Sequence, residues 1–273
     1  MEFSAIILTF NSEQYIETCL RSLVSSFVEI GASYEVFVID NGSKDRTRKL
    51  IQDVTDEMNA NIQLIPFEYN TGTTFSRNQG LKRAEGKRII ILDSDAYVTS
   101  EVVKELGCYL DENNECGMVV PKLTYPDGRF QISTDHFPTL WHKVRRFFFL
   151  KKMEGGETSE GLEQSPVDYA ISAFWMFTKD LLDDIGCLDE RIFYSPEDVD
   201  YCIRVWLSGK EIHYLPQYSM VHDAQEISRA KGIKINKFTI SHAKGLIYLF
   251  LKHRYFFGLS GLYKRIESIK AVR

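Results

Sequence analysis

The sequence predicts an α/β fold with a mostly parallel central sheet flanked by helices. Over the first 120 residues, short apolar runs typical of strands alternate with amphipathic stretches typical of helices. The strand-like runs are almost continuously apolar, as in parallel strands that helices cover on both faces. Polar clusters follow four of these runs directly. A length of 273 residues with 44% hydrophobic content fits one large core with appendages.

The expected elements follow one another in a regular order. Strands are expected at SAIILTF (4–10), YEVFVID (34–40), IQLIPFE (62–68) and KRIIILD (87–93). The first helix is expected just after Asn11–Gln14, which is similar to a capping box, with an apolar face over 15–27. A polar helix is expected over about 43–58, and another over 76–86, ended by Gly86.

Polar clusters at the ends of the strands predict a ligand site. In sheets of this class, ligands bind beyond the carboxyl ends of the strands. The clusters that follow the expected strands are Thr9–Asn11, Asp40–Ser43, Asn70–Gly72 and Asp93–Asp95. We therefore expect these clusters to converge on one edge of the sheet.

The pair Asp93 and Asp95 is a candidate metal site. In extended backbone, residues two apart share a face, so both carboxylates can meet one cation. Oxygen ligands suit Mg²⁺ or Mn²⁺, which can also hold a substrate diphosphate. The alternative is a polar turn in which an Asp, Thr99 or Ser100 caps the next helix. The pattern alone leaves both interpretations open.

Three further motifs each allow a structural and a functional interpretation. Asp40–Ser43 has strong turn chemistry, which we favour, although its carboxylate could accept the N–H of a nucleobase. Ser195–Asp198 is typical of an ordinary helix start, with Ser195 as the N-cap, Pro196 as the first residue and acids in the first turn. Glu197 or Asp198 could also serve as a general base, and the spacing does not decide between them. A lone His such as His222 is more often a satisfied polar residue, but it would complement the two carboxylates as a ligand.

The net charge of −5 is unevenly distributed. Residues 227–273 hold eleven Lys and Arg against one acid, which leaves about −15 on the rest. We expect a helical, basic and aromatic C-terminal extension over 226–273 that either packs on the core or meets an anionic membrane surface with the basic block 141–152. That block belongs to an expected mobile insertion or lid at about 136–166. The negative remainder argues against a nucleic-acid partner.

Cysteine usage and apolar runs predict a cytoplasmic location. The five cysteines are odd in number and form no C-x-x-C pair, which is typical of free thiols in a reducing compartment. The opening MEFSAIILTF has neither a basic segment nor a cleavage site, so we expect no signal peptide. No apolar run reaches the ~18–20 residues of a membrane span. Peripheral contact with the inner face of the cell membrane stays open.

Two classes of nucleotide-binding protein are excluded because their sequence motifs are missing. A dinucleotide oxidoreductase would carry G-x-G-x-x-G after the first strand, where LTFNSEQY has no glycine. A P-loop NTPase would carry G-x-x-x-x-G-K-[ST], which is absent from the sequence.

Four stretches stand in a specific order and spacing, although each is weak alone. They are AIILTFNSEQYIETCLRSL, VFVIDNGSKDRT, NTGTTFSRNQGLKRAEGKRIIILDSDAYV and LDERIFYSPEDVDYCIRVWLSGKEIHYLP. Together, over about residues 3–225, they resemble the inverting glycosyltransferases of family 2, which have the GT-A (Rossmann-like) fold. The nearest branch is the rhamnosyltransferase-like enzymes that build bacterial surface polysaccharides. The resemblance implies one domain over 1–225, with a nucleotide-sugar half (1–120) and an acceptor half (121–225).

The resemblance also implies roles for individual residues. Thr9, Asn11 and Glu13 would lie by the nucleotide, Asp40 would contact the base, and Asn70, Gly72 and Arg77 would shape the nucleotide pocket. Asp93, Ser94 and Asp95 would form the D-x-D motif, in which Asp93 and Ser94 would also bind the nucleotide sugar and Asp95 would be the direct metal ligand. Asp198 would be the catalytic base, and His222 would help to bind metal or diphosphate.

The implied reaction is an inverting, Mg²⁺- or Mn²⁺-dependent transfer from a UDP- or dTDP-linked sugar. The acceptor would be a hydroxyl of a saccharide or a lipid-linked saccharide. Beside Ser172, many relatives have Gly where this chain has Ala173 and bulky residues, and Asp223–Gln225 follows His222 in place of small residues. These departures leave the donor and the acceptor open. The alternatives are a non-catalytic nucleotide-sugar-binding relative and a sugar nucleotidyltransferase.

Overall fold

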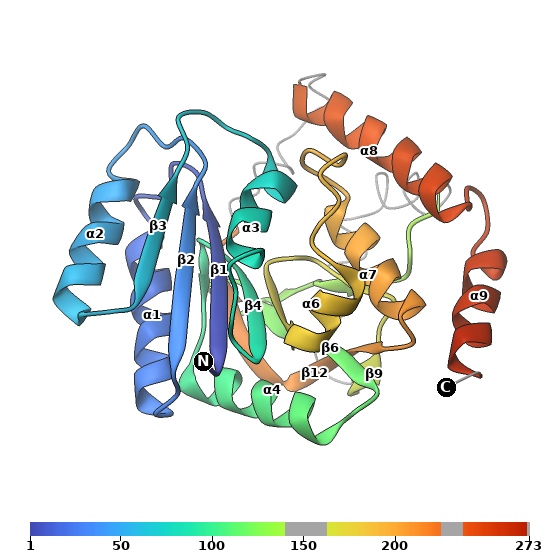
Figure 1. Cartoon of the computed structure of the whole chain (residues 1–273), viewed down its shortest axis with the longest axis horizontal. Coiled ribbons are helices and arrows are strands. Elements are labelled where there is room, and N and C mark those ends of the chain that lie inside the picture. The colour runs from blue at the N-terminus through green and yellow to red at the C-terminus, as the bar shows by residue number, and fades with distance from the viewer. Residues whose placement is uncertain (140–162, 225–236, 272–273) are drawn as a thin grey trace.

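The computed structural model describes residues 1–139, 163–224 and 237–271. Within them, ten strands form one sheet in the order β3-β2-β1-β4-β11-β6-β12-β5, with β7 beside β6 and β9 beside β12 (Figure 1). The strands are β1 (Phe3–Thr9), β2 (Tyr34–Asp40), β3 (Ile62–Pro66), β4 (Arg88–Asp93), β5 (Ala96–Tyr97), β6 (Cys116–Thr124), β7 (Phe130–Gln131), β9 (Ser165–Pro166), β11 (Phe174–Thr178) and β12 (Glu211–His222). The short strands β8 (Thr134–Asp135) and β10 (Tyr169–Ala170) pair with each other.

Strand directions confirm the predicted mostly parallel sheet. β3, β2, β1 and β4 run parallel, and β12 runs parallel to β6. β11 is antiparallel to both of its neighbours, β4 and β6, and joins the two parallel groups. The carboxyl ends of β1, β2, β3 and β4 therefore lie at one edge of the sheet.

Helices cover both faces of this sheet (Figure 1). They are α1 (Ile16–Glu29), α2 (Thr47–Met58), α3 (Thr73–Leu81), α4 (Ser100–Glu112), α6 (Lys179–Ile185), α7 (Glu197–Leu207), α8 (Lys237–His253) and α9 (Ser260–Lys270). One apolar core joins the sheet to α1, α2 and α4, and a second joins it to α3, α6 and α7. Alternate residues of β1 divide between these cores, since Ile6 belongs to the second and Ile7 to the first.

The predicted helix over 76–86 is displaced in the structure. It begins at Thr73 and ends at Leu81. Gly86 does not end it but lies against β1, where an added Cβ would stand 2.4 Å from the backbone nitrogen of Ser4. Glycine is required there for close backbone approach, which a sequence pattern cannot distinguish from a helix stop.

Two predicted helix caps are wrong. Tyr15 occupies the N-cap of α1 without a side-chain hydrogen bond, and the hydroxyl of Ser12 lies 2.9 Å from that of Ser94. The backbone N–H of Ser12 donates to Thr47 Oγ1 at 2.8 Å, which ties this loop to α2. At α7, Pro196 rather than Ser195 is the cap residue, so the helix begins one residue later than predicted.

The described part of the C-terminal segment is helical and packs on the core. Leu249, Phe250 and Tyr255 of the α8 region and Leu262 and Ile266 of α9 are buried in the same apolar core as α7. Packing was one of the two predicted alternatives for this segment. The basic block 141–152 lies outside the described residues, as does most of the predicted insertion.

The cysteines agree with the sequence expectation. All five cysteines are free thiols. Among the described residues, no helix combines the length and the hydrophobicity needed to cross a membrane.

Candidate active site

The carboxyl ends of the parallel strands bring the predicted polar clusters together. The backbone N–H of Asn11 donates to Ser43 Oγ at 2.8 Å, which joins the ends of β1 and β2. The side chain of Asn41 donates to Asn70 Oδ1 at 3.1 Å, which joins the end of β2 to the loop after β3. The predicted convergence on one edge is therefore confirmed.

The residues predicted to lie by the nucleotide surround the ends of β1 and β4. Thr9 is buried, and its Oγ1 has no hydrogen-bond partner among the described residues. Asn11 has a φ of 50°, in the left-handed region that Asn tolerates. Glu13 accepts a backbone N–H from the loop after β2 at 3.1 Å. The hydroxyls of Ser94 and Ser12 lie 2.9 Å apart. The nucleotide contacts of these residues stay predictions.

Asp40 closes the turn after β2, as the structural interpretation predicted. It is fully buried, and each carboxylate oxygen accepts the Ser43 N–H at 3.3 Å. Arg48 Nε lies 2.5 Å from Asp40 Oδ2 and supplies the compensating charge that a buried carboxylate needs. The sequence analysis missed Arg48, because α2 carries several exposed charges that look alike. A base contact from Asp40 stays a prediction.

Gly72 marks the place where the start of α3 meets the loop before α7. Its φ of 88° lies in the region that favours glycine, and an added Cβ would stand 2.5 Å from the carbonyl oxygen of Phe193. Asn70 Oδ1 accepts the Gly72 N–H at 2.9 Å, and the next N–H, of Thr73, donates to Phe193 O at 2.7 Å. Asn70 and Gly72 therefore shape this loop.

Asp93, Asp95 and His222 form a group that could hold a metal ion. One ligand atom from each lies within 4.8 Å of the others, and His222 Nε2 is 3.4 Å from Asp95 Oδ1. His222 reaches the site because it ends β12, which pairs with β5 beside the two carboxylates. Thr99, one of the predicted cap residues, caps α4 by accepting the N–H of Val102 at 3.4 Å, so neither carboxylate serves as the cap of this helix.

Gln131 orients the imidazole of His222. Gln131 is buried in β7, and its Oε1 accepts a hydrogen bond from His222 Nδ1 at 2.9 Å. This bond places a proton on Nδ1 and turns Nε2 toward the carboxylates. In the protonated ring Nε2 donates to Asp95, and in the neutral ring its lone pair can ligate a metal ion. Burial lowers the pKa of His222, but the hydrogen bond to Asp95 and the charges of both carboxylates outweigh it and raise the pKa. Nothing in the sequence distinguished Gln131.

Arg77 connects this carboxylate group to the start of α7. It is 2% exposed, and its Nη2 donates to Asp93 Oδ1 at 2.5 Å. Its Nη1 donates to Ser172 Oγ at 2.7 Å and lies 3.7 Å from Glu197 Oε1. The sequence placed Arg77 in the nucleotide pocket, whereas its described contacts are with acids and with Ser172. A nucleotide contact stays a prediction.

Glu197 and Asp198 differ in environment although they are adjacent. Glu197 is buried, and its Oε1 lies 3.5 Å from Ser172 Oγ. Burial and the neighbouring Asp198 charge raise the pKa of Glu197 to about 8, against the opposing effect of Arg77. Asp198 is half-buried, and its Oδ1 accepts the N–H of the following residue at 2.8 Å.

Comparison with known proteins identifies the family. The model described as "Glycosyl transferase family 2" matches residues 4–186, more than half of the chain. The chain belongs to this family. Family membership removes support for the sugar nucleotidyltransferase alternative and confirms the resemblance seen in the sequence.

Two curated relatives match most of the chain. Poly(ribitol-phosphate) beta-N-acetylglucosaminyltransferase TarS of Staphylococcus aureus is 32% identical over 84% of this chain and 37% of its own length. The dTDP-rhamnosyl transferase RfbF of Shigella flexneri is 25% identical over 80% of this chain and 68% of its own. The chain therefore spans little more than a third of TarS.

A solved structure confirms the GT-A fold. The S. aureus TarS fragment 1–349 in complex with UDP-GlcNAc aligns with a TM-score of 0.64 at 21% identity. The alignment covers 98% of this chain and 71% of that one. At this identity the likeness establishes the fold alone.

Proposed function

We propose that this protein is an inverting glycosyltransferase that moves a sugar from a nucleotide diphosphate to an acceptor hydroxyl. One observation carries the proposal. The buried Arg77 joins the group of two carboxylates and a histidine to the acidic pair at the start of α7. Asp93 and Asp95 lie on one side of Arg77, and Glu197 lies on the other. This arrangement provides a place for a metal-bound diphosphate beside a candidate base.

The residues suit a divalent cation with a hard ligand preference. Asp95 and His222 Nε2, with Asp93 beside them, would hold Mg²⁺ or Mn²⁺ and leave coordination positions for diphosphate oxygens. When bound, such an ion neutralises the charge that develops on the leaving diphosphate. Gln131 holds His222 in the tautomer that ligation requires.

Asp198 is the better candidate for the base. Burial and the adjacent Asp198 charge raise the pKa of Glu197, which disfavours its ionised form, and its Oε1 already lies near Arg77 and Ser172, whereas Asp198 is half-buried. In the proposed step, Asp198 takes the acceptor hydroxyl proton while the acceptor oxygen bonds to the anomeric carbon. The bond from that carbon to the diphosphate breaks on the opposite face, and its electron pair leaves with the diphosphate, so the configuration inverts.

The donor class follows from the relatives. TarS is named for N-acetylglucosamine transfer, its fragment binds UDP-GlcNAc, and RfbF is named for dTDP-rhamnose. We therefore expect a UDP- or dTDP-linked donor. The acceptor is expected to be a bacterial surface glycan or its lipid-linked precursor.

Asp198→Asn tests the base directly. The variant removes the proton acceptor while keeping size and hydrogen-bonding capacity, so transfer should fall at least ~100-fold. Nucleotide affinity should be unchanged, because Asp198 does not contact the diphosphate in this proposal. The assay is transfer from UDP-GlcNAc and from dTDP-rhamnose to glycan acceptors, with Mn²⁺. Wild-type turnover in Asp198→Asn would contradict the assignment, and inactivity of the wild type with bound donor would favour the non-catalytic alternative.

We also propose that the outer side of α8 and the following turn meet an anionic membrane surface. Ile247, Leu251 and Phe257 are 58%, 60% and 72% exposed, and the basic residues Lys244 and Arg254 are exposed nearby. Apolar side chains rimmed by cations suit the headgroup region of an anionic bilayer. The wild type should float with phosphatidylglycerol vesicles, and Leu251→Glu should not. A wild type that stays in the aqueous fraction at moderate salt would refute this proposal.

A further inference from the structure

The C-terminal helix α8 lies against the segment that carries the proposed catalytic pair. Figure 1 shows α8 running over the loop that leads into α7. At Gly245 the two backbones are so close that an added Cβ would stand 2.2 Å from the carbonyl oxygen of Ser195 and 3.0 Å from Pro196 Cδ. Ser195 and Pro196 directly precede Glu197, the first residue of α7. Only glycine permits this approach without movement of one backbone.

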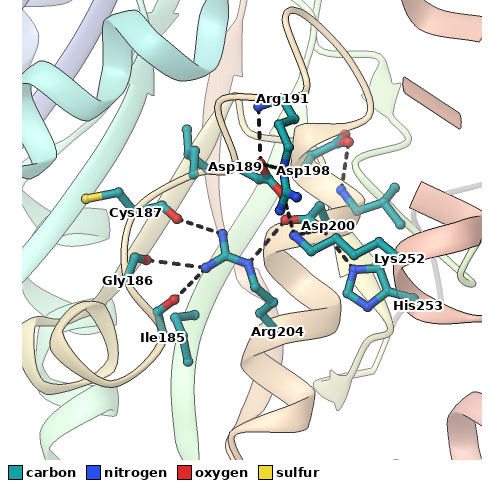
Figure 2. Close-up of polar contacts among 12 residues, drawn as sticks. Ile185, Gly186, Cys187, Asp189, Arg191, Asp198, Asp200, Arg204, Lys252 and His253 are labelled. Carbon is teal, nitrogen blue, oxygen red and sulfur yellow. Dashed lines mark hydrogen bonds and ion pairs between the residues drawn. The ribbon is translucent and has the colours of Figure 1, made fainter. Parts of the chain in front are cut away.

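One lysine of α8 bridges both ends of the same segment. Lys252 Nζ lies 2.8 Å from Asp189 Oδ2 and 2.6 Å from Asp200 Oδ1 (Figure 2). Asp189 lies before the loop, and Asp200 lies in the first turn of α7. The catalytic pair Glu197 and Asp198 therefore stands between two carboxylates that share a single ammonium group from another element.

Asp200 is buried, so its negative charge requires compensating partners. Its side chain is 1% exposed, and it also accepts from His253 Nε2 at 2.8 Å and pairs with Arg204 Nε at 3.2 Å. Burial raises the pKa of Asp200, but the hydrogen bond from His253 and the charges of Arg204 and Lys252 outweigh it and lower the pKa. Removal of a partner from such a site costs much more than loss of an exposed ion pair.

The same segment also contacts the nucleotide side of the site. Between Asp189 and Asp200, the carbonyl of Ile192 accepts a hydrogen bond from the Thr74 hydroxyl at 2.7 Å, and Phe193 packs against Gly72. The segment is thus held by α3 on one side and by α8 on the other. Its position sets the distance between the D-x-D carboxylates and the proposed base.

We propose that α8 is a positioning element of the active site, in which Gly245 and Lys252 hold the turn that presents Asp198. The inference rests on the proposed role of Asp198. Neither residue touches a reacting atom, so both act through the placement of residues 189–200. A misplacement of about 1 Å at such a site costs on the order of 100-fold in rate.

Gly245→Ala tests the contact, and Gly261→Ala is its matched control. Both glycines lie in C-terminal helices, and nothing lies within 4 Å of a Cβ added at Gly261. Hydrogen exchange of the full-length protein should rise about tenfold in the peptide 195–203 of Gly245→Ala and stay unchanged in Gly261→Ala. The strands β1–β4 should keep their wild-type protection in both variants.

Kinetics separate positioning from general destabilisation. With UDP-GlcNAc or dTDP-rhamnose and Mn²⁺, Gly245→Ala and Lys252→Met should lower kcat on the order of 10–100-fold at unchanged donor KM. Lys252→Arg, which keeps the charge, should recover most of kcat. Equal exchange in Gly245→Ala and Gly261→Ala, or loss of protection across the whole domain, would overturn the inference. Undiminished transfer by Asp198→Asn would instead overturn the base assignment and leave the exchange result unaffected, so the two failures are distinguishable.

Discussion

Replacement of Arg77 by methionine should destabilise the protein, because this buried guanidinium compensates the charge of Asp93 and donates to Ser172. Methionine preserves most of the aliphatic volume but removes the contacts to Asp93, Ser172 and Glu197. Arg77 is 2% exposed, so water cannot replace it. Breaking a fully buried pair by removing one partner costs about 3–5 kcal/mol, but the Asp93 side chain is 33% exposed. We therefore expect Arg77→Met to lose a smaller unfolding free energy, about 2–3 kcal/mol.

Urea unfolding followed by circular dichroism measures this loss. Lys49→Met is the matched control, because Lys49 pairs with Asp53 on the exposed face of α2, where the two side chains are 72% and 42% exposed. That surface pair should contribute less than about 1 kcal/mol. Combining Arg77→Met with Asp93→Asn should recover part of the loss, since the second substitution removes an uncompensated charge. If Arg77→Met costs no more than Lys49→Met, the bridging role of Arg77 is wrong.

Three further predictions follow from the site. Gln131→Leu should weaken Mn²⁺ affinity by about 10–100-fold, because His222 Nδ1 loses its hydrogen-bond partner. Calorimetry with UDP present measures this affinity, and a wild-type value would refute the orienting role of Gln131. The pKa of Glu197 is raised from 4.5 to about 8 in the folded state, so the folded state binds this proton more tightly than the unfolded state. The unfolding free energy should therefore fall as pH rises between those values, by a few kcal/mol at most. Urea titrations should show a flatter pH profile for Glu197→Gln, and parallel profiles of variant and wild type would contradict this. Gly72→Ala should lower the unfolding free energy more than Gly128→Ala. Both glycines have a positive φ, which costs an alanine about 1–3 kcal/mol of strain, but only the Cβ at position 72 would clash with a neighbouring backbone. Equal melting temperatures of the two variants would contradict this.

The sequence was sufficient to predict the sheet edge. Apolar strands followed by polar residues identify both the parallel strands and the side at which their ends meet, and this pattern is enough to place Asp93 and Asp95 at that edge. Their partner His222 was also found, although only as one of two interpretations. Hydrophobic periodicity carries this information because it is a local property of the chain, and the strand-end rule for ligands of such sheets then gives the edge.

Contacts between distant segments could not be predicted in the same way. Gln131 and Ser172 reach the site through short antiparallel pairings and a loop, neither of which leaves a periodic signal. Gly86 and Gly245 are required by close backbone approach rather than by local conformation, so the first was mistaken for a helix stop. Arg48 could not be distinguished from its exposed neighbours on α2 until its ion pair with Asp40 was seen.

The packing of α8 also lay beyond sequence reasoning. Its basic and aromatic composition fits a membrane-facing helix and a core-packed helix equally well. The structure places one side of α8 against α7, through Lys252 and His253, and leaves Ile247 and Leu251 exposed on the other. A single helix can therefore combine a structural contact with a surface suited to another partner.

The central claim is a nucleotide-diphosphate site that depends on a divalent cation held by Asp95. The most direct test is a thermal-shift panel of UDP, dTDP, GDP and CDP, each with and without Mn²⁺, on the wild type and on Asp95→Ala. A ligand at 100 times its Kd stabilises the folded state by about 2.7 kcal/mol, which is a readily measured rise in melting temperature. We predict a rise with UDP or dTDP that requires both Mn²⁺ and Asp95. No rise with any nucleotide, or the same rise in Asp95→Ala, would contradict the claim.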